Sequence, residues 1–265
     1  MHIPHAGILL LAAIAAGAIN SVAGGGSFVS FPALLLFGMP GGMPPVKANA
    51  TNTVALWPGQ PASVWAYRHE FRSLPRRVLV PLTVTGVLGG LLGAYVLLIT
   101  PPATFMILVP WLLLVATLIF MMSGRISRWV RQRAEHGEHG EHHEFATGRG
   151  IFLQIFIAFY LGYFGAGAGI LLLAMLALLG MEHIHTMNAL KAWLTTVSNG
   201  VAAVLFVVSH AVYWPQAIIM IVGSVAGGYF GAYFARKTKP EYVRAIVIVI
   251  GFTLTIYFFA RQIWS

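Results

Sequence analysis

Residues 23–39 read AGGGSFVSFPALLLFGM and residues 165–181 read GAGAGILLLAMLALLGM, so one pattern occurs twice. The two stretches have the same residue at five of 17 positions, and in each a glycine cluster interrupts an apolar run that would otherwise form one long helix. A lysine and several polar residues follow each stretch, beginning at Lys47 in the first half and at Lys191 in the second. Apolar segments broken at the same place in both halves are typical of transporters with internal repeats, whose binding sites lie at the breaks.

The composition indicates an integral membrane protein. Of the 265 residues, 58% are hydrophobic and only 9% are charged, whereas soluble domains carry roughly 25% charged residues. The apolar runs are long, which suits membrane helices better than barrel strands of about 10 alternating residues. Cysteine is absent, which excludes disulfides, thiol catalysis and cysteine-ligated metals. We therefore expect an all-α polytopic membrane protein that needs no cofactor.

The repeat divides the chain into three parts. We predict a first membrane repeat at residues 1–122, a cytoplasmic linker rich in His, Glu and Arg at 123–149, and a second membrane repeat at 150–265. Each repeat is expected to hold a glycine-broken hairpin, either re-entrant or made of two short spanning helices, and three spanning helices. The hairpins are predicted at 6–39 and 150–181, and the spans at 47–66, 78–99, 103–122, 190–209, 213–235 and 241–262.

Two further patterns refine these spans. The span at 47–66 is expected to kink at residues 58–61, because prolines there remove backbone hydrogen bonds. Residues 86–96 and 224–234 share six of 11 positions, including the GxxxG pairs Gly89/Gly93 and Gly227/Gly231. Such pairs let two helix backbones approach closely in lipid, so we expect these glycines to serve packing.

The distribution of positive charge predicts the orientation. Thirteen of the 16 Lys and Arg residues lie in three loops, at 68–77, 125–149 and 236–244. This follows the positive-inside rule and does not resemble the basic face of a nucleic-acid-binding protein. We expect the three loops in the cytoplasm and both termini on the outer side. Each half then crosses the membrane an odd number of times, so the two repeats are predicted to have inverted topology.

The candidate binding site combines the glycine turns with the polar faces of the helices that follow. Glycine exposes backbone N–H groups, and a half-helix that begins just after it points its positive end at the break, which suits an oxyanion. In the second half Lys191, Thr195, Ser198 and Asn199 share one helix face. The predicted lining residues are Asn20, Gly24, Gly25, Gly26, Ser27, Asn49, Thr51, Asn52, Thr53, Gly165, Gly167, Gly169, Thr195, Ser198 and Asn199, with Lys47 and Lys191 as entry or gate charges.

The acidic residues bear on the kind of substrate. The chain has no Asp, and its seven Glu residues lie in predicted loops or at helix edges. Carriers of cations usually place an acid among their spans, so an anionic or neutral substrate is favoured. The tract at 134–145, AEHGEHGEHHEF, holds four candidate metal ligands, His136, His139, His142 and His143. We interpret it as a solvated linker, and keep a divalent metal-ion carrier that uses this loop as the alternative function.

Several of these residues resemble one known family. Residues 23–27 with Phe31 and Pro32, the run Lys-Ala-Asn-Ala-Thr-Asn at 47–52, and the second glycine turn ahead of residues 187–191 are similar to the TauE/SafE family of sulfite exporters. The resemblance spans nearly the whole chain. It implies export of a small sulfur-containing anion, sulfite or an organosulfonate such as sulfoacetate, across the inner membrane of a bacterium, with both termini on the outer (periplasmic) side. The inverted repeats predict a secondary transporter that works by alternating access.

The expected partners follow from this interpretation. They are a small anionic substrate and membrane lipids, with no nucleic acid, and the oligomeric state stays open. Since no nucleophile–base pair is recognisable, we expect no enzymatic activity. A membrane-embedded enzyme or a sensor that does not transport is the alternative from another functional class.

Overall fold

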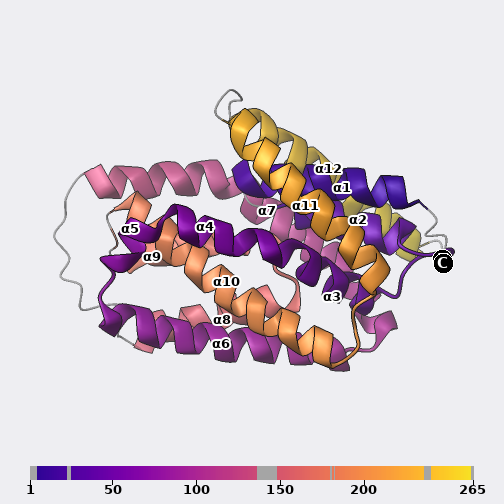
Figure 1. The fold of residues 1–265 in the computed structure, drawn as a ribbon, viewed down its shortest axis with the longest axis horizontal. Coiled ribbons are helices and arrows are strands. Elements are labelled where there is room, and N and C mark those ends of the chain that lie inside the picture. The colour runs from indigo at the N-terminus through magenta and orange to yellow at the C-terminus, as the bar shows by residue number, and fades with distance from the viewer. Residues whose placement is uncertain are drawn as a thin grey trace.

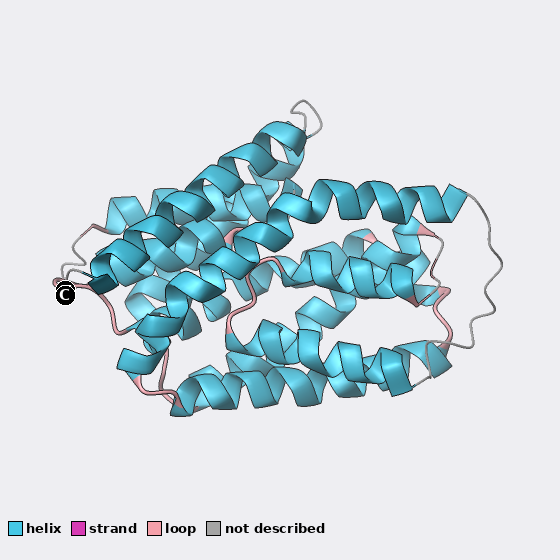
Figure 2. Cartoon of the chain, turned by 180° about the vertical axis from the view of Figure 1, so that it is seen from behind, coloured by secondary structure: helices cyan, strands magenta, loops and turns pink. Residues whose placement is uncertain are grey.

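The computed structural model describes residues 5–22, 25–135, 148–179, 181, 183–235 and 240–263. Throughout these ranges the regular secondary structure is helical, and no strand occurs in them (Figure 2). The first half contains α1 (Ala6–Val22), α2 (Ser27–Phe37), α3 (Pro45–Leu56), the 3-10 helix η1 (Trp57–Gly59), α4 (Gln60–Ala66), α5 (Arg68–Arg72), α6 (Arg76–Ile99) and α7 (Pro102–Glu135). The second half contains α8 (Gly148–Tyr163), α9 (Ala168–Leu178), α10 (Ile184–Val208), α11 (Trp214–Ala235) and α12 (Pro240–Ile263).

The helices have the length and composition of membrane helices. Within the described residues, four stretches are long and apolar enough to cross a membrane: Arg76–Ile99, Pro102–Ile126, Ile184–Val208 and Ala245–Ile263. The helices of the two glycine-broken hairpins, α1 with α2 and α8 with α9, are apolar but shorter. Large apolar side chains such as Leu88, Tyr95 and Val225 face outward, as expected for a surface in contact with lipid. The predicted all-α polytopic membrane protein is confirmed.

Both predicted hairpin breaks are present. α1 ends before the first glycine cluster and α2 begins after it, and α8 and α9 flank the second cluster in the same way. The expected kink at 58–61 is a full interruption, because Pro58 and Pro61 remove donors within four residues and the chain forms η1 between α3 and α4.

Two boundaries differ from the prediction. α7 continues to Glu135 instead of ending at 122, so residues 123–135 of the predicted linker are helical. Arg, Gln, Ala and Glu in this segment favour helix, and polarity alone therefore placed the helix end too early. α10 begins at Ile184, six residues before the predicted start, because no glycine or proline interrupts the chain there.

Helices of the first half of the chain pack directly against helices of the second half. α1 lies along α11, and α8 lies along α6 (Figure 1). A Cβ atom on Gly89 of α6 would lie 2.6 Å from the carbonyl oxygen of Ile155, and one on Gly227 of α11 would overlap the carbonyl oxygen of Ile14. Close packing at these GxxxG glycines is thus confirmed.

Two hydroxyl hydrogen bonds repeat this exchange between the halves. Ser224 on α11 donates to the carbonyl oxygen of Ala55 on α3 at 3.0 Å. Ser198 on α10 donates to the carbonyl oxygen of Gly86 on α6 at 3.1 Å. Gly86 and Ser224 are matched positions in the aligned segments 86–96 and 224–234. One serine hydroxyl therefore joins α3, the helix that carries Lys47, to α11, and another joins α10, the helix that carries Lys191, to α6. In the first contact the serine lies on α11, and in the second it lies on α10.

Candidate functional site

The two glycine turns meet on one face of α7. A Cβ atom on Gly25 would lie 2.9 Å from the ring of Phe120, and one on Gly167 would lie 3.4 Å from the carbonyl oxygen of Ala116. Ala116 and Phe120 are one helical turn apart in the spanning part of α7. The rings of Phe31, just after the first turn, and Phe164, at the second, are 5.5 Å apart. Turns that belong to different halves of the sequence thus form one central region.

The turns depend on glycine for their backbone conformation. Gly25, Gly165 and Gly167 have φ angles of 132°, 79° and 75°, a region that residues with a Cβ atom rarely adopt. These angles reverse the chain within a few residues. As a result α2 begins at Ser27 and α9 begins at Ala168, each with its amino end at the turn. The positive ends of two helix dipoles are therefore directed at the central region.

The N–H donors of the first turn already have an acceptor. The side-chain oxygen of Asn20, Oδ1, accepts from the N–H of Gly25 at 2.9 Å and from the N–H of Gly26 at 2.7 Å. Two successive N–H groups converging on one oxygen form an anion-binding nest, and here the oxygen belongs to the protein. Gly24 lies outside the described residues. In the second turn the N–H of Gly165 donates to the carbonyl oxygen of Tyr160, while the N–H of Gly169, in the first turn of α9, has no acceptor within that helix.

Two asparagines on α3 contact both turns. Asn49 donates through Nδ2 to the carbonyl oxygen of Tyr163 at 2.8 Å, beside the second turn. Asn52 donates through Nδ2 to the hydroxyl of Ser27 at 3.3 Å, in the first turn. Both asparagines are 1% exposed, and the Oδ1 atom of each accepts no hydrogen bond from any described residue. One face of α3 thus joins the two turns and carries two buried acceptors without donors.

α10 contributes polar groups to the second turn. A Cβ atom on Gly169 would lie 3.7 Å from the Cδ atom of Lys191, and one on Gly165 would lie 3.9 Å from the Oδ1 atom of Asn199. The ammonium group of Lys191 donates to Asn188 at 2.9 Å, and Asn199 donates to Gln60 at 3.2 Å. The hydroxyl of Thr195 donates to the carbonyl oxygen of Lys191. The predicted face of α10 therefore borders the second turn at Lys191 and Asn199.

The comparisons with known proteins agree with this architecture. Residues 9–258 match the family described as sulfite exporter TauE/SafE. The chain belongs to the TauE/SafE family. Haemophilus influenzae has a "Probable membrane transporter protein" that is 28% identical over 265 residues, covering 97% of this chain and 95% of the relative. YfcA of Escherichia coli K12, also named a probable membrane transporter protein, is 28% identical and covers 92% and 86% of the two chains.

A more distant relative extends the comparison. YunE of Bacillus subtilis, named a probable membrane transporter protein, is 23% identical over 261 residues, covering 92% of this chain and 95% of the relative. No solved structure matches the chain. This TauE/SafE chain is thus an integral membrane protein. It matches relatives named as probable membrane transporters over most of their length.

Some predicted residues of this TauE/SafE protein make side-chain contacts with groups outside the turns. Lys47 is exposed, and its Nζ atom is 5.3 Å from the centre of the Tyr213 ring. The hydroxyl of Thr51 accepts from the N–H of Tyr213 at 3.1 Å, and Ser198 bonds to α6 as described above. Thr53 donates to the backbone of Asn49. The four histidines of the tract at 134–145 lie outside the described residues.

Several contacts at the site were not predicted from the sequence. The backbone carbonyl of Tyr163 and the ring of Phe120 carry no sequence signal, because their roles depend on which helices pack together. Gln60 and Asn188 are polar residues next to helix starts or breaks, and that position could have drawn attention to them. Gln60 lies between the two prolines that interrupt the helix after α3.

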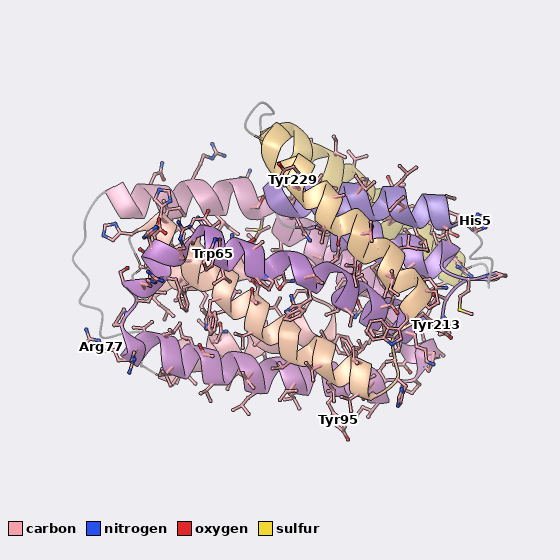
Figure 3. All side chains as sticks on the ribbon, in the orientation of Figure 1. His5, Trp65, Arg77, Tyr95, Tyr213 and Tyr229 are labelled. Carbon is pink, nitrogen blue, oxygen red and sulfur yellow. The ribbon has the colours of Figure 1, made fainter. Side chains whose placement is uncertain are left out.

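The ends of the molecule differ in the residues they present. Figure 3 places Arg77 at one end of the long axis, and Tyr95 and Tyr213 toward the other.

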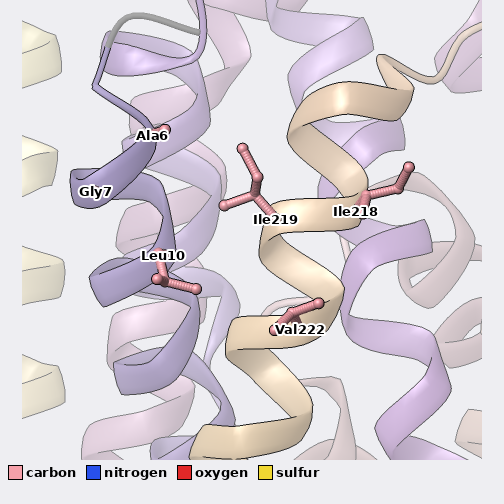
Figure 4. Close-up of a pocket in the computed structure, with 6 residues that line it drawn as sticks. All are labelled: Ala6, Gly7, Leu10, Ile218, Ile219 and Val222. Atoms are coloured by element: carbon pink, nitrogen blue, oxygen red, sulfur yellow. The ribbon is translucent and has the colours of Figure 1, made fainter.

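A pocket of about 340 Å³ lies between α1 and α11 (Figure 4). Its lining is apolar, formed by Ala6, Gly7, Leu10, Ile218, Ile219 and Val222. Ile218 and Val222 are more than half exposed, so this pocket belongs to the apolar outer surface and not to the turn region.

Proposed function

We propose that this chain is a secondary transporter that exports a small sulfur-containing anion, sulfite or an organosulfonate such as sulfoacetate, across a bacterial inner membrane. One observation carries the proposal. Two glycine turns from opposite halves of the chain meet on the same turn of α7, and two half-helices begin there. Broken helices whose amino ends meet within the membrane are the arrangement by which secondary carriers hold anionic substrates.

The electrostatics of the site support an anion. The amino ends of α2 and α9 supply partial positive charge, and Lys191 supplies a full one beside Gly169. The sequence has no Asp, and the glutamates within the described ranges, Glu70, Glu135 and Glu241, lie in α5, at the end of α7 and at the start of α12. An anion placed between the turns would thus meet donors and a cation, with no carboxylate from the described part of the chain near the turns.

The transport step in this proposal is alternating access between two inverted repeats. The hairpins α1–α2 and α8–α9 reach the centre from opposite ends of the long axis (Figure 1). A movement of one repeat against the other would open the turns to one side and then to the other. Asn20 would release the N–H groups of Gly25 and Gly26 when the substrate anion replaces its oxygen. The cytoplasmic loops and the outer position of both termini, predicted from the positive charges, complete the proposal.

The alternatives have less support. The metal-ion carrier depends on His136, His139, His142 and His143, which lie outside the described residues, and no group of three or more His, Asp or Glu residues gathers in the described part. A carrier is also favoured over an enzyme, because the polar groups at the turns are amides, hydroxyls and a lysine without a nucleophile–base pair.

Transport by the purified protein in sealed liposomes tests the proposal. We expect saturable uptake of sulfite or sulfoacetate, and a lower rate with Asn52→Ala at equal amounts of folded protein. Thr255→Ala is the matched control, because Thr255 is buried but bonds only to the backbone of its own helix. Deletion of residues 135–144 should leave the flux of the anion unchanged. Binding without flux would support a sensor, and flux of zinc or nickel alone, lost on that deletion, would support the metal carrier.

A further inference from the structure

We propose that the transported substrate carries, besides its negatively charged group, a hydrogen-bond donor, a hydroxyl or an ammonium group, and that Asn49 recognises this donor. The inference rests on the proposed function and narrows its substrate class. It starts from the two acceptors on α3. The Oδ1 atoms of Asn49 and Asn52 are buried and have no donor among the described residues. Buried polar atoms almost always have a partner, so an acceptor without one in a binding region calls for a ligand.

The orientation of the Asn49 amide is fixed by its neighbour. Only a donor can face the carbonyl oxygen of Tyr163, so the nitrogen must lie 2.8 Å from it and the oxygen must point elsewhere. Asn52 is less constrained, because the hydroxyl of Ser27 can either donate or accept. Asn49 therefore presents an acceptor in every arrangement of this network, whereas Asn52 can present either group.

The hydroxyl donors of two residues around the turns are already used. The hydroxyl of Thr53 donates to the backbone oxygen of Asn49 itself. The hydroxyl of Tyr160 donates to the carbonyl oxygen of Ala166 at 2.7 Å. Lys191 directs one of the three donors of its ammonium group to Asn188 and keeps the others for an anion. A donor brought by the substrate would satisfy the Asn49 oxygen without breaking any of these bonds.

The site is consequently bipolar. The amino ends of α2 and α9 and Lys191 suit a negatively charged group. The oxygen of Asn49, a residue that bonds beside the second turn, suits a hydrogen-bond donor. Ligands of this class are small sulfonates with a hydroxyl or ammonium group, and the singly protonated form of sulfite. Fully ionised sulfoacetate has no donor, so within the proposed substrates it is the weaker ligand.

The experiment compares two sulfonates of nearly the same size, isethionate, which has a hydroxyl group, and ethanesulfonate, which lacks it. Binding to the purified full-length protein is measured by calorimetry. We expect isethionate to bind roughly ten-fold to 100-fold more tightly than ethanesulfonate. Taurine, which has an ammonium group, should bind like isethionate. The Asn49→Ala variant should lose the discrimination, and Thr255→Ala should keep it.

The outcomes separate this inference from the proposed function. Equal affinity of the two sulfonates for the unmodified protein would overturn the inference alone, and would mean that water satisfies Asn49. If Asn49→Ala still binds isethionate more tightly than ethanesulfonate, Asn49 is not the residue that recognises the donor. If Asn49→Ala does not fold, the affinities of isethionate and ethanesulfonate are compared in the unmodified protein and in Asn52→Ala. That comparison still decides whether the protein recognises a donor on the substrate. Binding of no sulfonate and no sulfite would overturn the proposed function itself, and the inference with it.

Discussion

Asn49 donates a hydrogen bond of 2.8 Å to the carbonyl oxygen of Tyr163, a residue 114 positions later in the chain. Three residues further along α3, Asn52 reaches Ser27 in the first turn. One helix face thereby fixes the distance between the two glycine turns. Any movement that separates the hairpins must break or exchange these bonds.

The first prediction concerns the unequal strength of these two bonds. Asn49→Ala should lower the free energy of unfolding by about 1–3 kcal/mol, because it leaves a buried carbonyl without a donor. Asn52→Ala should cost less, since its bond is 3.3 Å long and the accepting hydroxyl of Ser27 can rotate to another partner. Denaturant unfolding in detergent, followed by tryptophan fluorescence, gives both values. A larger loss for Asn52→Ala would contradict this ranking.

The second prediction uses two neighbouring glycines of α11. A methyl group at Gly227 overlaps the backbone of Ile14, whereas at Gly228 the nearest atom is the carbonyl oxygen of Gly17 at 4.0 Å. Gly227→Ala should therefore destabilise the protein by about 1–3 kcal/mol. Gly228→Ala should be neutral or slightly stabilising, because alanine favours helix. Melting temperatures of the two variants provide the comparison, and equal values would refute the close packing of α1 on α11.

The third prediction tests the nest of the first turn. In Asn20→Asp a carboxylate would accept from the N–H groups of Gly25 and Gly26 and would repel an incoming anion. Sulfite or sulfonate binding should weaken roughly ten-fold or more. Gln262→Glu adds the same charge on α12, where Gln262 bonds to the backbone of Met106, and should change binding little. Equal effects of the two substitutions would mean that the first turn does not receive the anion.

The fourth prediction separates the two lysines. Lys191→Met should reduce anion affinity roughly ten-fold to 100-fold, because it removes the cation beside Gly169. Lys47→Met should lower the transport rate by a smaller factor, because Lys47 is exposed and lies over the ring of Tyr213. Flux and binding measured on both variants decide the order, and a stronger effect on binding at Lys47 would reverse our assignment of these charges.

Part of this arrangement was predictable from the sequence. Glycine at positions 25, 165 and 167 breaks the apolar runs whatever surrounds it, because a positive φ angle is a local property of the backbone. The apolar character of the spans and the polar faces of α3 and α10 are local as well, since a period of 3.6 residues appears in any amphipathic helix. The helical continuation to Glu135 differs from the prediction, because the polarity of residues 123–135 indicates a loop although Arg, Gln, Ala and Glu favour helix.

An all-helical membrane protein with two broken hairpins is predictable from the sequence alone, because composition and backbone preference act within a few residues. Which polar groups meet depends on how distant helices pack. Ser198 and Lys191 lie on the same predicted face, yet Ser198 bonds to Gly86 on α6 and Lys191 lies beside Gly169. The side-chain oxygen of Asn20 accepts hydrogen bonds from the N–H groups of Gly25 and Gly26, which the sequence predicts to bind a ligand. The rotation of each helix about its axis selects these partners, and that rotation follows from packing between segments that lie far apart in the chain.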